Sequence, residues 1–96
     1  MLEVNKEIVI SGESLLEALA DIEFILISLH NMGSYYHDKP VEEYQRATTN
    51  FIDDEKVTDK LANVRKILSE KFDTSIGEDY MGDIERHMEH IKFWTP

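Results

Sequence analysis

The sequence predicts an all-α protein: a small four-helix bundle with an extended or β-like N-terminal arm over residues 2–10. Apolar residues recur at steps of three and four along four stretches, which is the period of an α-helix. Residues that commonly start or end helices separate these stretches. The predicted helices span residues 11–33, 39–52, 54–72 and 78–93. We find no linker or repeat, so residues 1–96 are expected to form a single helical domain.

The arm shows partial alternation. The apolar residues at even positions are Leu2, Val4, Ile8 and Ile10, so in a strand they would lie on one side. The β-branched residues among them favour an extended strand. A lone strand leaves backbone groups unpaired, so it has to lie in a groove or pair with a sheet edge or a copy of itself. One hypothesis is therefore a structural or regulatory homodimer, joined through residues 2–10 and the first helix.

The first predicted helix, residues 11–33, is the central element because its apolar arc is unusually wide. Ser11 is the expected N-cap, and Gly33 is the expected residue after the helix end. Two apolar stripes run along the helix. The first consists of Leu15, Leu19, Ile22, Leu26 and Leu29, and the second of Ala18, Ile22, Ile25, Leu29 and Met32. Such a helix is expected to have neighbours on more than one side.

The second and third helices carry narrower stripes. Asp38 can cap the second helix and Pro40 suits its first turn. If the second helix continued without a break, its apolar stripe would not coincide with the apolar residues of the third helix. A break between the two helices is therefore predicted near Asp53. The stripes are Val41, Tyr44, Thr48 and Phe51 in the second helix, and Val57, Leu61, Val64, Leu68 and Phe72 in the third.

The last predicted helix follows a turn that ends at Gly77. It carries Met81, Ile84, Met88 and Ile91 on one side.

Charge is the most informative global property. Twenty acidic against ten basic residues give a formal net charge of −10. Such a surface repels nucleic-acid phosphates and attracts basic proteins. The chain has no cysteine, no signal-peptide pattern and no apolar run long enough to cross a membrane. We therefore expect a cytoplasmic protein that binds neither nucleic acid nor membranes.

The first helix and the loop after it suggest a partner-binding surface. The helix carries Glu17 and Asp21, and Phe24 lies on the same otherwise polar stripe. Tyr35 and Tyr36 follow in the loop and add two amphipathic rings. We expect these five residues to bind and block a basic protein surface. A small acidic helical domain with acids on one helix and a nearby tyrosine pair resembles the design of bacterial nuclease-immunity proteins, and inhibitor or anti-defence proteins act in the same way.

The last helix suggests a different hypothesis, a metal-binding protein. Asp83, His87 and His90 are spaced by four and three residues, so they share one face and could hold a divalent metal. A helical ion-pair stripe explains the same residues without metal. We find no catalytic motif and therefore expect no enzyme. Glu23 and His30 could pair on the first helix, but no nucleophile or oxyanion hole accompanies them.

Overall fold

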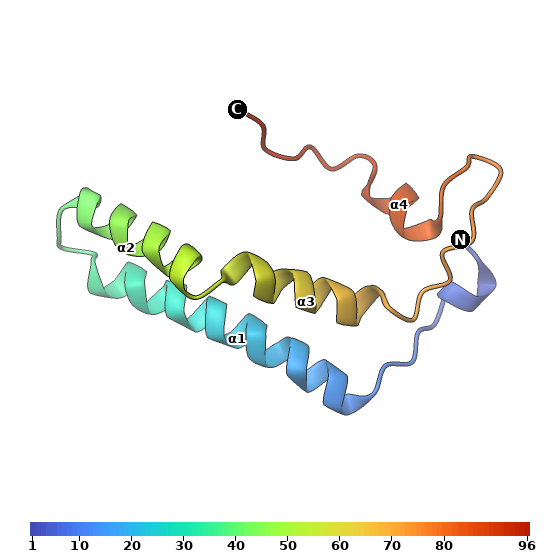
Figure 1. Cartoon of the computed structure of the whole chain (residues 1–96), viewed down its shortest axis with the longest axis horizontal. Coiled ribbons are helices and arrows are strands. Elements are labelled where there is room, and N and C mark those ends of the chain that lie inside the picture. Colours follow the sequence, from blue (N-terminus) through green and yellow to red (C-terminus); the bar gives the residue numbers. More distant parts are fainter. The chain divides into compact units, whose positions relative to one another are not determined.

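The computed structural model describes residues 1–96, and all of its regular elements are helical. They are the 3-10 turn η1 (Glu3–Asn5) and the helices α1 (Gly12–Tyr35), α2 (Val41–Asp54), α3 (Val57–Ser69) and α4 (Asp83–Met88) (Figure 1). The contacts divide the chain into two compact units. One is Ser11–Leu68, and the other combines Met1–Ile10 with Ser69–Pro96. The predicted all-α class is confirmed. No helix combines the length with the hydrophobicity that a membrane-spanning segment requires.

The start of α1 is set by local chemistry. The Ser11 hydroxyl accepts a hydrogen bond from the Ser14 backbone N–H at 3.2 Å, which confirms Ser11 as the N-cap. The helix runs through Gly33 and ends at Tyr35, two residues later than expected. At the end, the Tyr36 N–H donates to the Met32 carbonyl at 3.0 Å, so the last turn is closed without a glycine.

The unit Ser11–Leu68 is a helical hairpin. The chain reverses between α1 and α2, so that α1 lies beside α2 and then α3 (Figure 1). The predicted break between the second and third helices occurs at Glu55 and Lys56. Lys56 has a φ of 51°, a left-handed conformation that ends α2 before α3 begins. Because α4 belongs to the other unit, a bundle of four helices is not shown.

The hairpin uses only one of the two stripes predicted on α1 as its core. Ala18 and Ile25 are 2% and 8% exposed. In contrast, Leu19 and Leu26 of the other stripe are 49% and 57% exposed. Val57 and Val64 supply the buried apolar residues of α3. The contact between the helices therefore runs along the stripe of smaller and β-branched residues, and the leucines stay on the surface.

The second unit differs from the prediction at both ends of the chain. The N-terminal arm contains no strand; instead, η1 turns the backbone so that Asn5 is buried. The helix expected over residues 78–93 is limited to α4, Asp83–Met88. Tyr80 has a φ of 61°, which a helix cannot contain, so the chain enters α4 only after this turn.

Candidate protein interface

The acidic residues predicted to bind a partner lie on the flank of α1 next to α3. The Asn63 side-chain N–H₂ donates long hydrogen bonds to Glu17 at 3.4 Å and to Asp21 at 3.5 Å. An amide donor can be replaced by water at little cost when the site is exposed. Each carboxylate therefore keeps oxygens that can accept hydrogen bonds from a basic partner.

Phe24 lies on the same flank and is partly covered by its own chain. Its ring lies 5.7 Å from the Phe51 ring, with an interplanar angle of 46°. The Lys60 ammonium lies 5.3 Å from the centre of the Phe24 ring. The side chain nonetheless remains 36% exposed. The two contacts hold the ring in place and leave its outer part accessible.

The tyrosine pair lies at the C-terminal end of α1. The Tyr35 and Tyr36 rings meet edge to face at 4.8 Å, and Tyr36 lies 6.4 Å from Tyr44 of α2. The Lys39 ammonium lies 4.0 Å from the centre of the Tyr35 ring and donates a 2.9 Å hydrogen bond to the Tyr35 carbonyl. Tyr35 is 62% exposed, so the cluster presents one ring that neighbours hold in position.

Helix geometry places the acidic and aromatic groups on one flank of α1. Phe24 and Tyr35 are eleven residues apart, which is about three turns and about 16 Å along the axis. Glu17 lies seven residues before Phe24, about two turns in the other direction. We call Glu17, Asp21, Phe24 and Tyr35 the acidic flank. Tyr36 lies about 100° further round and packs on α2 instead.

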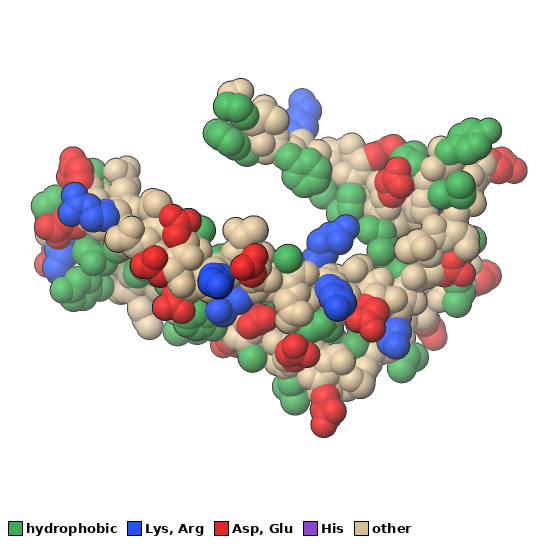
Figure 2. Space-filling view, in the orientation of Figure 1, with side chains coloured by type: hydrophobic (Ala, Val, Ile, Leu, Met, Phe, Trp, Pro, Cys, Tyr) green, Lys and Arg blue, Asp and Glu red, His purple; other side chains and the backbone are tan.

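The charges of the hairpin are divided between its helices. α1 carries Glu13, Glu17, Asp21 and Glu23 and has no lysine or arginine. α3 carries three bases, Lys60, Arg65 and Lys66, and one acid, Asp59. Figure 2 shows acidic and basic side chains mixed on the face that it presents. The contacts of Lys60 and Lys39 with the aromatic rings could not be predicted from the sequence, because they depend on how the helices and the loop are packed.

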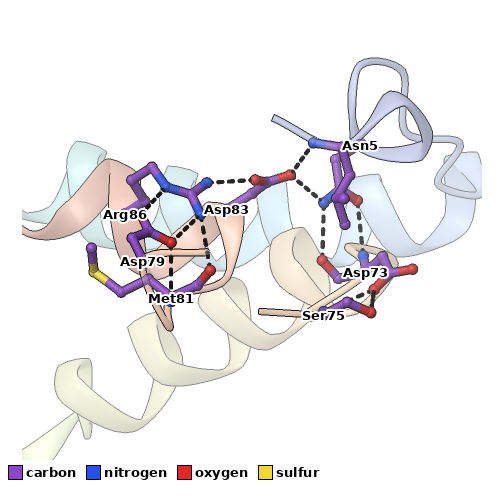
Figure 3. A network of polar contacts seen from close by, with 8 residues as sticks. Asn5, Asp73, Ser75, Asp79, Met81, Asp83 and Arg86 are labelled. Atoms are coloured by element: carbon purple, nitrogen blue, oxygen red, sulfur yellow. Dashed lines mark hydrogen bonds and ion pairs between the residues drawn. The ribbon is translucent and has the colours of Figure 1, made fainter. Parts of the chain in front are cut away.

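Asp83, predicted as a metal ligand, is instead part of a hydrogen-bonded network (Figure 3). One carboxylate oxygen accepts 2.8 Å bonds from the Leu2 backbone N–H and the Asn5 side chain. The other accepts a 2.8 Å bond from Arg86. The Asn5 side chain, the Leu2 N–H and Arg86 together hold the pKa of Asp83 below its ordinary value. The ion-pair interpretation therefore accounts for Asp83.

The two histidines do not join Asp83 in a ligand set. The His87 and His90 rings lie 6.4 Å apart between their centres. No three histidine or carboxylate side chains lie close enough together to share a metal ion. The structure therefore gives no geometric support for a metal site at these residues.

Arg86 and Asn5 extend the network on both sides of Asp83. Arg86 binds Asp79 through two bonds of 2.6 and 2.8 Å, and its guanidinium holds the pKa of Asp79 well below the usual range. Asn5 donates to the Asp73 carbonyl at 2.9 Å and accepts from the Asp73 N–H at 2.8 Å. The network closes the unit formed by the two ends of the chain. The sequence pattern gave no sign of it, because the partners of Asn5 are 68 and 78 positions away.

Comparisons with protein-family models, with curated proteins and with solved structures yield no match.

Proposed function

We propose that this chain is a small acidic protein-binding module that occupies a basic surface of a partner protein, in the manner of an inhibitor, immunity or anti-defence protein. The observation that carries the proposal is the acidic flank. Glu17 and Asp21 share one side of α1 with Phe24 and Tyr35, and neighbouring side chains hold both rings.

Charge and aromatic area have different roles in such a binding event. The net charge of −10, with no base on α1, attracts a basic protein over a distance and raises the association rate. Aromatic rings that become buried at an interface supply most of the affinity. Phe24 and Tyr35 already have fixed neighbours, so ordering them on binding costs little conformational entropy.

A capture experiment with charge-reversed variants tests the proposal. The full chain is immobilised and exposed to a lysate of its source organism, and bound proteins are quantified by mass spectrometry. The test variant is Glu17→Lys with Asp21→Lys. The control is Glu42→Lys with Asp53→Lys, because these exposed residues lie on the outer side of α2, away from Phe51. Both variants raise the net charge from −10 to −6, since each substitution adds two charges.

The proposal predicts a basic protein that the wild type and the control variant recover equally. Recovery on the test variant should fall by about tenfold or more. The variant has lost two charges at the rim of the interface, and with them the attraction that speeds association with a basic partner. Equal recovery on both variants would show that the acidic flank is not the binding surface.

A further inference from the structure

A surface hollow lies beside α2, and Tyr36, the aromatic residue that is not part of the acidic flank, helps to line it. The volume of the hollow is about 250 Å³, and its lining residues are Tyr36, Glu43, Arg46, Ala47 and Asn50. We call these five residues the Arg46 hollow. The four that belong to α2 are spaced by three, one and three residues, so they lie within about 100° of arc on that helix.

The charged groups of the Arg46 hollow have no partner within the chain. Arg46 is the only base of α2, and it forms no ion pair. Glu42 and Glu43 lie four and three residues before it, at spacings where ion pairs commonly form on a helix. Neither carboxylate is paired with it, so the guanidinium donors of Arg46 and the oxygens of Glu43 are both available to a ligand.

The apolar walls of the Arg46 hollow are already in position. The Tyr36 ring meets the Tyr35 ring edge to face at 4.8 Å and lies 6.4 Å from the Tyr44 ring. Ala47 is half-buried, and its small side chain leaves the space above it open. A ligand group that enters the hollow therefore meets an ordered aromatic ring, so binding costs little conformational entropy in the protein.

The charges of the Arg46 hollow favour a ligand that carries both an acid and a hydrogen-bond donor. A guanidinium binds a carboxylate through two parallel N–H bonds, and the Asn50 amide adds a donor one turn further on. Glu43 would repel a simple anion, but it accepts hydrogen bonds from an ammonium or an N–H group. Asp54 lies on the same face of α2, about 12 Å beyond Arg46 along the axis and outside the hollow.

We infer that the Arg46 hollow binds an α-carboxylate whose neighbouring nitrogen donates hydrogen bonds, as in a free amino acid or at the C-terminal end of a peptide. The carboxylate lies on Arg46 and Asn50, and the nitrogen lies on Glu43. The Cβ atoms of residues three apart on a helix are about 5–6 Å apart, which suits two groups on one carbon atom. An apolar or aromatic side chain of the ligand packs on Ala47 against the Tyr36 ring.

The size of the hollow limits the ligand to one residue. A volume of about 250 Å³ equals the share of about eight water molecules in the liquid, at about 30 Å³ each. This site goes beyond the proposed function, because the acidic flank binds a basic surface through other residues. Binding at either site can therefore be lost without loss at the other.

Titration of the full chain with L-phenylalanine, followed by NMR at the amide resonances of residues 43–50, tests the ligand chemistry. The resonances should shift with a Kd of about 1 mM or tighter. L-Phenylalaninamide lacks the carboxylate and should bind at least about tenfold more weakly. N-Acetyl-L-phenylalanine separates the two sources: tighter binding than L-phenylalanine assigns the site to the end of a peptide, and weaker binding assigns it to a free amino acid.

Three variants test the residues. Arg46→Gln should weaken binding of L-phenylalanine by about tenfold or more, because the two charge-assisted bonds are lost. Ala47→Leu keeps every charge and should block binding by filling the hollow. The control is Glu42→Gln, which removes an acid near Arg46 that does not line the hollow, and it should leave binding almost unchanged.

Three results would overturn this assignment of the Arg46 hollow. One is the absence of saturable shifts up to about 20 mM L-phenylalanine. The others are equal binding of L-phenylalanine and its amide, and binding to Arg46→Gln that is as tight as binding to the wild type.

Discussion

The Asn5 side chain donates a 2.8 Å hydrogen bond to the carboxylate of Asp83, a residue 78 positions further along the chain. Both residues are buried, at 4% and 8% exposure. The same amide also makes two bonds to the backbone of Asp73. One short polar side chain thus ties the first residues of the chain to the segment that leads into α4.

Replacing Asn5 should therefore destabilise this unit strongly. Asn5→Ala removes three hydrogen bonds, one to the Asp83 carboxylate and two to the backbone of Asp73, which costs about 1–3 kcal/mol. Amide hydrogen exchange at Asp73 is the direct readout, because its N–H donates to Asn5. Lys6→Ala removes only an exposed ion pair to Glu3 and serves as the control. Unchanged protection of the Asp73 amide in Asn5→Ala would show that Asn5 does not hold the unit together.

The bond between Arg86 and Asp79 predicts a specific dependence on pH. The pKa of Asp79 is lowered from 3.8 by Arg86, so the folded state binds its proton less readily than the unfolded chain does. The stabilisation is therefore fully present above an ordinary aspartate pKa and is lost as the pH falls through the lowered value. Asp79→Asn should reduce the stability of residues 69–96 at neutral pH and have a smaller effect in acid.

Urea denaturation followed at the amide resonances of residues 73–88 measures this difference at about pH 6 and about pH 2.5. Glu78→Gln is the matched control, since it removes one charge from the preceding exposed residue. If the difference in stability between wild type and Asp79→Asn grew toward low pH, the ionised carboxylate of Asp79 would not be the group that stabilises this unit.

The left-handed Lys56 predicts a substitution that stabilises the hairpin. This conformation is unfavourable by about 1 kcal/mol for a residue with a side chain, whereas glycine adopts it without strain. Lys56→Gly should raise the free energy of unfolding by about 0.5–1 kcal/mol, and Lys56→Val should lower it. Ala62→Gly, inside α3, should instead cost about 1 kcal/mol. Thermal denaturation of the three variants measures these changes in stability. A similar loss of stability in Lys56→Gly and Ala62→Gly would contradict the prediction.

The contact between Phe24 and Phe51 predicts a measurable coupling between α1 and α2. With the rings 5.7 Å apart, a double-mutant cycle with Phe24→Leu and Phe51→Leu should give an interaction free energy of about 0.5–1.5 kcal/mol. Additive effects of the Phe24 and Phe51 substitutions would mean that the two rings do not stabilise each other.

Tyr35→Ala removes a residue that is 62% exposed, so it should affect partner binding far more than stability.

Local patterns predicted the three helices of Ser11–Leu68 well, although not their arrangement as a hairpin. Ser11 caps α1 through a bond that spans three residues, and the phase change near Asp53 marked the break that occurs two residues later. Periodicity revealed two apolar stripes on α1, but it could not tell which of them is packed. That choice depends on the partner helices, and they pack against Ala18 and Ile25 rather than Leu19 and Leu26.

The second unit could not be predicted in the same way, since distant polar contacts hold it together. Apolar residues from Met81 to Ile91 have a helical period, yet α4 ends at Met88. Asp83 and Arg86 share a helical spacing, but nothing local links them to Asn5 or Asp79. The alternation in residues 2–10 suggested a strand, whereas the hydrogen bonds of Leu2 and Asn5 favour the turn at η1. At the candidate interface, the sequence pattern pointed to Phe24 and Tyr35 as residues to test, and the cations that contact their rings, Lys60 and Lys39, become visible only in the folded chain.

Binding of the acidic flank of α1 to a basic protein surface should depend strongly on salt concentration, because charge attraction contributes to it. Calorimetric titration of the captured partner with the full chain is repeated between about 50 and about 500 mM salt, a range in which the screening length falls severalfold. We predict that affinity falls by about tenfold or more for the wild type, and much less for Glu17→Lys with Asp21→Lys. An affinity that does not change with salt, or that changes equally in both proteins, would show that the acidic flank does not bind the partner.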